Sequence, residues 1–193
     1  IYTEPKDMVT GLHDIFQCFN RTSISFDREN VYTFETLGKR IIRDFEKERT
    51  MLLILNKKET VGAFFDYIKA ELKDVKIFYL TTNLCPEHRN NQLESIKNYL
   101  KNSTEKVLII STNLIEAGVD LSADHVYRSL AGLDSIAQAA GRCNRNGETE
   151  LGRVTVIQLA GDEFRVIRTA QKKTMEVCEK YNQSDRTESM IFP

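Results

Sequence analysis

Two short stretches of the chain carry residue types suited to binding phosphate groups. The first runs from Ser111 to Asp120 and combines hydroxyl, amide and carboxylate side chains with a glycine. The second runs from Asp134 to Gly147 and contains two arginines, Arg142 and Arg145. Hydroxyl, amide and backbone N–H groups commonly contact phosphodiesters, and guanidinium groups bind phosphate oxygens through a rigid fork. These residues therefore indicate phosphate chemistry, of a nucleic acid or of a nucleotide.

The spacing within the second stretch predicts that its polar groups share one side of a helix. Gln138, Arg142 and Arg145 follow one another by four and three residues, which places side chains on one helical face. Gly141 lies between them, and a glycine inside a helix costs about 0.5–1 kcal/mol relative to alanine. We therefore expect another backbone or a ligand to approach closely at Gly141. The alternative is a solvated helix end with arginines near its C-terminus and a cap that includes Gly147.

The first stretch follows a short apolar run, Val107 to Ile110, which is expected to be a buried strand. Ligands of open parallel sheets bind beyond the carboxyl ends of the strands, and both stretches are expected to lie there. Thr112 and Asn113 are therefore candidates for contacts with a phosphodiester. Gly118 permits a turn close to a ligand, and Asp120 can accept hydrogen bonds from a ribose hydroxyl. Gly-Val-Asp by itself is a common turn, so the order and closeness of the two stretches carry the interpretation.

The elements that must position these stretches alternate between strands and helices. The expected strands are Met51–Leu55, Val75–Leu80, Val107–Ile110, His125–Tyr127 and Val154–Leu159. The expected helices are Glu59–Leu72, Pro86 to about Leu100, Ser135 to about Arg142 and Glu163 to about Tyr181. This alternation predicts an α/β domain of three layers, in which a mostly parallel central sheet has helices on both faces.

The segment before this alternating pattern is less regular. Residues 1–48 are predicted to lead into a domain at 49–193, and the sequence leaves open whether they pack on that domain. Helices are expected near Leu12–Phe19 and at Phe34–Phe45, with a strand at Ser23–Phe26. The chain begins at Ile1 and not at methionine, so we expect it to come from a longer protein.

Composition limits the class of protein. The chain has 193 residues, of which 41% are hydrophobic and 28% charged, as expected for one α/β domain. It has neither an apolar run of roughly 18 residues nor a signal-like N-terminus, so a cytoplasmic protein without a membrane span is expected. The four cysteines form no CxxC pair, and no metal site is expected. With 27 basic and 28 acidic residues, any contact with nucleic acid must be local.

The two stretches together resemble motifs V and VI of superfamily 2 helicases. The residues that carry this resemblance are Thr112 with Glu116–Asp120, and Gln138 with Gly141, Arg142 and Arg145. The finer pattern, with Cys143-Asn144 in the middle of the second motif, resembles the CRISPR-associated helicase–nuclease of type I systems. The strand that ends at Asn56 resembles motif IV, and the loop Thr81–Arg89 occupies the place of a further nucleic-acid-contacting motif. The resemblance spans roughly Met51 to Leu159.

This resemblance implies the second, C-terminal RecA-like domain of an ATP-dependent DNA helicase. Arg142 and Arg145 would reach the γ-phosphate of ATP, with Arg145 as the arginine finger and Gln138 orienting the same region. The implied nucleotide contacts are Gly118, Asp120 and Gly141. The implied contacts with single-stranded DNA are Thr112, Asn113, Asn56, Thr82 and Arg89, of which those in the loop match the family loosely.

Two elements of a complete ATPase are absent from the sequence. There is no GxxxxGK[ST] phosphate loop and no Asp-Glu box to hold magnesium. ATP and Mg²⁺ are therefore expected to be held mainly by the N-terminal RecA-like domain of the same parent chain, and the isolated chain is expected to be inactive. If the resemblance holds, a CRISPR RNA-guided surveillance complex is a further partner.

Other functions remain open at this point. The alternatives are the C-terminal domain of a DEAD-box or DEAH-box RNA helicase, and a non-catalytic RecA-like module that binds nucleic acid through Arg142 and Arg145. The dipeptide His13-Asp14 suggests an HD nuclease, but such a site needs several clustered ligands. The other histidines, His88 and His125, lie in separate predicted elements.

Overall fold

The computed structural model of the chain describes residues 21–81, 86–116, 121–184 and 190–192. Within these residues seven strands form one sheet, in the order β3-β4-β2-β5-β6-β1-β7. The strands are β1 (Thr22–Tyr32), β2 (Thr50–Ile54), β3 (Val75–Leu80), β4 (Lys106–Ser111), β5 (His125–Ser129), β6 (Gly152–Leu159) and β7 (Met190–Phe192). Strands β1 to β6 pair in parallel, and β7 pairs antiparallel with β1. The predicted mostly parallel sheet is confirmed.

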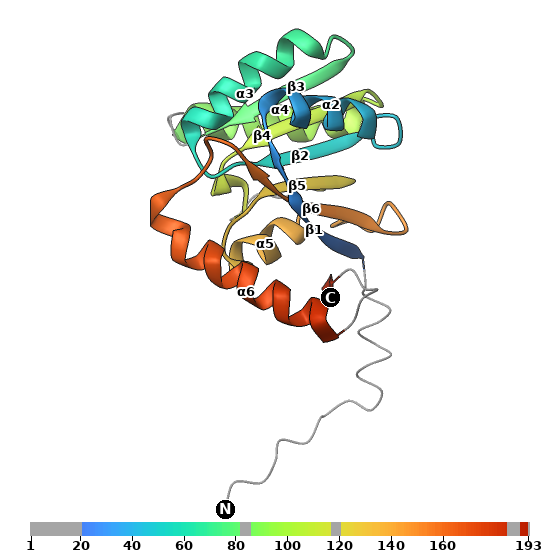
Figure 1. Ribbon diagram of the computed structural model, residues 1–193. Helices are drawn as coiled ribbons and strands as arrows, with labels where there is room; N and C mark the ends of the chain where they lie inside the picture. The colour runs from blue at the N-terminus through green and yellow to red at the C-terminus, as the bar shows by residue number, and fades with distance from the viewer. Residues whose placement is uncertain (1–20, 82–85, 117–120, 185–189, 193) are drawn as a thin grey trace, which may run out of the picture.

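Helices cover both faces of this sheet. They are α2 (Phe34–Asp44), α3 (Lys58–Glu71), α4 (Pro86–Asn102), α5 (Leu133–Ala140) and α6 (Arg168–Ser184), with short 3₁₀ helices η1 (Asn113–Glu116) and η2 (Arg165–Ile167). Helices α2 and α3 contribute to the core on one face, whereas α4, η1 and α5 contribute to the core on the other. Figure 1 shows α5 and α6 lying together, away from α2 and α3. The three-layer α/β fold is therefore confirmed.

The central strand β2 explains why the sheet needs cover on both faces. All five of its residues are buried. Met51 and Leu53 join the core beneath α2 and α3, and Leu52 and Ile54 join the opposite core. A strand that is buried on both faces reads as a continuous apolar run instead of an alternating one, which is how this strand was recognised in the sequence.

Helices α2 and α3 begin in different ways. Helix α2 has a capping box, in which Thr33 and Thr36 each accept a hydrogen bond from the backbone N–H of the other. The N-cap residue of helix α3, Lys57, makes no side-chain cap hydrogen bond. Instead, the buried carboxylate of Asp162, from the loop after β6, accepts hydrogen bonds from the backbone N–H groups of Asn56 and Lys57 at 2.9 and 3.1 Å. A carboxylate at a helix N-terminus is stabilised by the helix dipole.

Several boundaries differ from those predicted. Strand β1 belongs to the same sheet as the other strands, and helix α2 belongs to the same core. The sequence left open whether residues 1–48 pack on the domain, and residues 22–48 do. The C-terminal helix was expected to start at Glu163. Instead the short helix η2 comes first, and α6 starts at Arg168. Strand β7 was not predicted, because a three-residue edge strand depends on its partner β1. The helix expected near Leu12–Phe19 lies outside the described residues.

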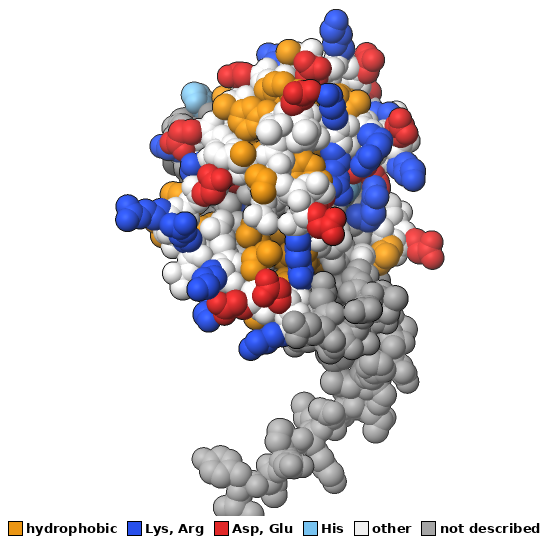
Figure 2. Space-filling view, in the orientation of Figure 1, with side chains coloured by type: hydrophobic (Ala, Val, Ile, Leu, Met, Phe, Trp, Pro, Cys, Tyr) orange, Lys and Arg blue, Asp and Glu red, His pale blue; other side chains and the backbone are white. Residues whose placement is uncertain are grey.

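Acidic and basic side chains both occur across the face shown in Figure 2. This agrees with the formal net charge of −1. Among the described residues, no helix has the length and apolar character that crossing a membrane requires.

Candidate functional site

The predicted phosphate-binding residues lie on one side of the sheet. They extend from the carboxyl ends of its strands, called the carboxyl edge below, to the amino ends, called the amino edge. Thr112 and Asn113 follow β4 at the carboxyl edge, and Asn56 follows the neighbouring strand β2 at the same edge. Helix α5 begins beyond β5 and ends at Ala140. Beyond that helix, Cys143 forms a parallel bridge with Ala123, which precedes β5.

The expectation that both stretches lie at the carboxyl edge is therefore wrong for the end of the second one. Helix α5 starts at the carboxyl edge and leads back toward the amino ends of the strands, where the backbone N–H of Asn144 donates to the carbonyl oxygen of Ala123 at 2.8 Å. The amide of Asn144 donates to the carbonyl oxygen of Arg21, the residue before β1. The loop that carries Arg145 thus lies at the amino edge.

The predicted single helical face is also corrected. Helix α5 ends at Ala140 with Gly141 as its C-cap, so only Gln138 is inside the helix, where its side chain is exposed. Arg142 and Arg145 lie beyond the helix because Cys143 pairs with Ala123 and Asn144 adopts a positive φ of 46°. These constraints come from distant parts of the chain and cannot be seen in residue spacing.

Of the two close neighbours expected at Gly141, a ligand or another backbone, the second is not found among the described residues. Gly141 is exposed, and a Cβ there would meet the carbonyl oxygens of Gln138 and Ala137 at 3.4 and 3.7 Å, which is ordinary contact. The glycine that is required for packing is Gly152, at the start of β6. A Cβ on Gly152 would lie 2.6 Å from Cys143 Sγ and 2.7 Å from Asn144 Cβ.

Arg142 joins the two stretches to each other. Its side chain is buried, with 8% of the residue exposed, and its Nε donates to the carbonyl oxygen of Ile115 in η1 at 3.2 Å. Its own carbonyl oxygen accepts from the backbone N–H of Ala123 at 2.9 Å. The two stretches were linked in the sequence only by their order, and the structure brings them into contact through this arginine.

Asn144 fixes the loop that carries Arg145. It is 2% exposed, and its amide nitrogen donates to the carbonyl oxygens of Thr149 and Arg21 at 2.7 and 3.2 Å. Its amide oxygen accepts from the backbone N–H of Thr149 at 3.0 Å. The amide therefore closes a short loop in which Arg145 is exposed. Asparagine tolerates the left-handed conformation better than most residues, which suits it to this position.

The remaining predicted nucleic-acid contacts differ in accessibility. Asn113 is exposed at the start of η1, and Arg89 is half-buried on α4. Thr112 is buried, and within the described part of the chain its hydroxyl has no hydrogen-bond partner. The amide nitrogen of Asn56 donates to Ser129 Oγ at 3.2 Å and to the carbonyl oxygen of Leu130 at 3.0 Å, so this side chain is already engaged. Thr82, Gly118 and Asp120 lie outside the described residues.

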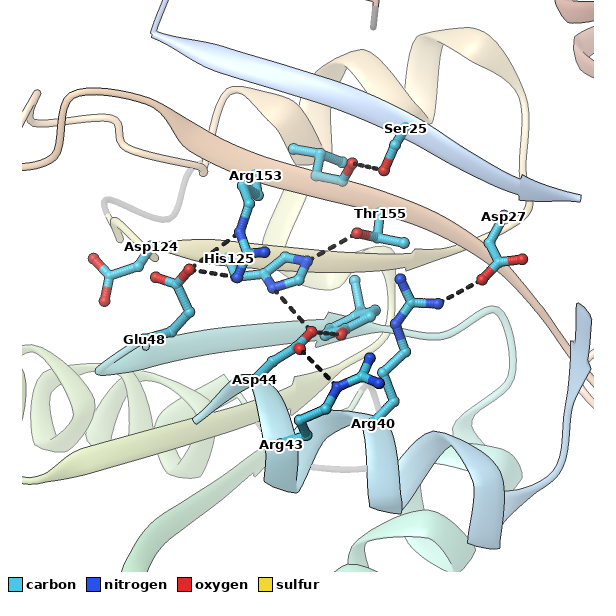
Figure 3. Close-up of polar contacts among 12 residues, drawn as sticks. Ser25, Asp27, Arg40, Arg43, Asp44, Glu48, Asp124, His125, Arg153 and Thr155 are labelled. Carbon is cyan, nitrogen blue, oxygen red and sulfur yellow. Dashed lines mark hydrogen bonds and ion pairs between the residues drawn. The ribbon is translucent and has the colours of Figure 1, made fainter. Parts of the chain in front are cut away.

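A second polar cluster lies on the opposite face, between α2 and the strands β5 and β6 (Figure 3). His125 Nε2 lies 2.9 Å from Thr155 Oγ1, and its Nδ1 lies 3.7 Å from the Asp44 carboxylate, which also accepts a hydrogen bond from the Tyr127 hydroxyl. Burial, aided by the positive charges of Arg153 and Arg40 and opposed by Asp44, lowers the pKa of His125 to about 4.

This cluster is a structural one. A histidine with so low a pKa is neutral near pH 7 and is a weak general base. Among the described residues, no group of three or more histidine, cysteine, aspartate or glutamate side chains is arranged to hold a metal ion. The cluster could not be predicted from the sequence because its members come from separate elements, although a histidine at the start of an expected strand was a visible signal.

Solved structures with a similar fold define the class of this domain. The superposition on T. fusca Cas3 bound to AMPPNP has a TM-score of 0.69 at 15% identity and covers 89% of this chain and 23% of that one. The C-terminal domain of the DEAD-box protein Dbp5 gives a TM-score of 0.55 at 17% identity over 81% of this chain and 87% of that one. A structure described as a CRISPR RNA-guided surveillance complex, pre-nicking, gives 0.60 at 16% identity and covers 84% and 23%. The fold matches that of the RecA-like domains of Cas3 and DEAD-box proteins.

The sequence comparisons then identify the family. Residues 47–148, just over half of the chain, match the family described as CRISPR-associated nuclease/helicase Cas3, C-terminal. The chain belongs to this family.

Curated relatives agree with that assignment. A CRISPR-associated nuclease/helicase Cas3 of Haloferax volcanii is 44% identical over 89 residues, which are 45% of this chain and 9% of the relative. One from Methanothermobacter thermautotrophicus is 24% identical over 155 residues, 77% of this chain and 18% of the relative. The chain thus spans less than a fifth of the length of these two relatives.

We expect the substitution Asn144→Asp to destabilise the loop that carries Arg145. A carboxylate keeps the acceptor for Thr149 but cannot donate to the carbonyl oxygens of Arg21 and Thr149. The free energy of unfolding, measured with urea, should fall by about 1–3 kcal/mol, the cost of leaving buried polar groups without partners. The exposed neighbour provides a control, since Asn146→Asp should change it by less than about 0.5 kcal/mol. Equal effects of the two substitutions would contradict this role of Asn144.

The buried His125 should make stability depend on pH. The unfolded chain binds a proton at this histidine below a pKa of 6.5, whereas the folded chain does so only below about 4. Stability is therefore lost as the pH falls from 6.5 toward 4, by about 2 kcal/mol at pH 5 relative to pH 7. Urea unfolding at pH 7, 6 and 5 checks this, with His125→Gln as the comparison. If both proteins lose the same stability, His125 is not the titrating group.

Proposed function

We propose that this domain is the second motor domain of an ATP-dependent DNA helicase of the Cas3 type. The observation that carries the proposal is the buried hydrogen bond from Arg142 to Ile115, which joins the two stretches on one side of the sheet. Family membership supports the helicase assignment. In this proposal, ATP hydrolysis between this domain and an N-terminal RecA-like partner changes the gap between the two and moves single-stranded DNA through it.

The two arginines have different roles in this proposal. Arg142 is buried and donates from Nε to a backbone carbonyl, so it orients the segment. Arg145 is exposed on a loop that Asn144 holds at both ends, which suits a group that must reach a phosphate bound by another domain. Arg145 is therefore our choice for the arginine finger. Gln138, exposed on α5, is proposed to orient the same region, with Gly141, Gly118 and Asp120 on the nucleotide side.

Single-stranded DNA is proposed to bind at the carboxyl edge. Asn113 is exposed there and can contact the phosphodiester directly, with Thr112 beside it and Arg89 on α4. Because the amide of Asn56 is engaged by protein groups, we assign it a supporting role at this edge. The proposed DNA contacts and the proposed ATP contact therefore lie at opposite ends of η1 and α5, on one side of the sheet.

The partners follow from what this sequence lacks and from the family. With no phosphate loop and no Asp-Glu box in the chain, ATP and Mg²⁺ are proposed to be held mainly by the N-terminal RecA-like domain of the parent chain. The similarity to a structure described as a CRISPR RNA-guided surveillance complex supports such a complex as the assembly that recruits the parent.

The test is ATP turnover by the parent protein with single-stranded DNA, comparing wild type with Arg145→Ala. Arginine fingers contribute on the order of 10³–10⁵ in rate, so we expect a loss of at least about two decades in kcat with folding intact. The control is Arg168→Ala, which removes an exposed arginine at the start of α6 and should leave turnover unchanged.

Other outcomes of this experiment favour the alternatives. Unchanged turnover with weaker, salt-sensitive binding of nucleic acid would favour a non-catalytic binding module. Stimulation by single-stranded RNA but not by DNA would favour an RNA helicase of the DEAD-box or DEAH-box kind.

The isolated chain is expected to show no ATP hydrolysis above background. The groups that cradle the phosphates and hold the metal are not in its sequence. Phosphate release by the purified chain, with and without single-stranded DNA, measures this, with Arg145→Ala as a check for contaminating ATPases. Turnover that is abolished by Arg145→Ala would show that the chain contains a complete site.

A further inference from the structure

The short link between β5 and α5, residues 130–132, makes hydrogen bonds with several elements. The carbonyl oxygen of Leu130 accepts hydrogen bonds from Asn56 at 3.0 Å and from Gln171 of α6 at 2.8 Å. The carbonyl oxygen of Ala131 accepts one from the buried hydroxyl of Thr174 at 2.8 Å. The backbone N–H of Leu130 donates to Ile157 in β6 at 2.8 Å. The entry to α5 is therefore fixed to β2, β6 and α6.

Arg128 lies beneath this link and connects it to α5 itself. It is 2% exposed and is the second-last residue of the buried strand β5. Its Nη1 donates to Asn56 Oδ1 and to the carbonyl oxygen of Ser129, both at 2.8 Å. Its Nη2 donates to the hydroxyl of Ser135, within the first turn of α5, also at 2.8 Å. One guanidinium thus joins the end of β2 to the first turn of α5.

We propose that Arg128 and Ser135 are positioning residues for the segment that follows α5, setting the direction of this helix and with it the placement of Arg145. The inference rests on the proposed function. The planar guanidinium of arginine holds two partners in a fixed geometry, which a lysine cannot reproduce.

The direction of α5 depends on the residues that lead into the helix. It has eight residues, about two turns, and its N-cap residue, Gly132, makes no side-chain cap. A Cβ on Gly132 would lie 2.4 Å from Asp134 Oδ1 and 3.3 Å from Ala170 Cβ, so the link runs close against α6. A small change of direction at the first turn is carried directly to the residues beyond Ala140. Misplacement of a catalytic group by about 1 Å can cost on the order of 10² in rate.

The test compares Ser135→Ala with Ser135→Thr in the parent protein, with ATP turnover measured in the presence of single-stranded DNA. Ser135→Ala removes the acceptor for Arg128, and we expect kcat to fall by about ten- to a hundredfold. The KM for ATP should change by less than about twofold, because the proposed partner domain holds most of the nucleotide. Ser135→Thr keeps a hydroxyl and should restore most of kcat. Wild-type kcat in Ser135→Ala would overturn the proposal.

The controls separate positioning from stability and from the proposed function. Ser25→Ala removes a hydroxyl bond on β1, two strands away from β5, from Ser25 Oγ to the carbonyl oxygen of Val154 at 3.3 Å, and should leave kcat unchanged. If Ser135→Ala does not fold, Arg128→Lys, which keeps the charge but not the two-pronged geometry, should show the same loss of kcat at unchanged KM. A fall in kcat that only matches the loss of folded protein would overturn the proposal.

Arg145→Ala distinguishes the two possible failures. If Arg145→Ala abolishes turnover and both positioning variants do not affect it, the proposed function stands and the positioning role fails. If Arg145→Ala has no effect, the arginine finger fails, whatever Ser135→Ala shows.

Discussion

The burial of β2 on both faces is the constraint on which the rest of the structure depends. All five residues of this strand are buried, and it pairs with β4 on one side and with β5 on the other. A strand in this position needs helices above and below it, and its polar backbone must be satisfied where the strand ends. Protein groups do this: Asp162 accepts the N–H groups of Asn56 and Lys57, and the Asn56 amide bonds to the next strand.

The hydrogen bonds at the end of β2 also help to position the proposed site. Asn56, which follows β2, also holds the link into α5, since it contacts both Leu130 and Arg128. Helix α5 then crosses from the carboxyl edge toward the amino edge, where Asn144 closes the loop that carries Arg145. The residues proposed to contact DNA and the arginine proposed to contact ATP therefore lie at opposite ends of this segment.

Much of the fold could be predicted from the sequence, because it depends on local patterns. Apolar runs such as Met51–Leu55 indicated strands buried on both faces, and amphipathic segments such as Glu59–Leu72 indicated helices, so that the α/β class and parallel sheet followed. The segment order Thr112 to Asp120 and Gln138 to Arg145 also indicated the helicase family. The boundaries at α5 and α6 and the edge strand β7 could not be predicted, since each depends on pairing or packing with a distant segment.

The sequence by itself determined the residue types of the proposed site and the class of chemistry they suit, because hydroxyl, amide and guanidinium groups at these spacings favour phosphate whatever surrounds them. Only the tertiary structure decided which of them are available. It buried Arg142 against Ile115, exposed Arg145 on a loop closed by Asn144, and engaged the Asn56 amide with Arg128. The physical reason is that burial and hydrogen-bond partners come from elements far apart in the chain, which spacing along the sequence does not encode.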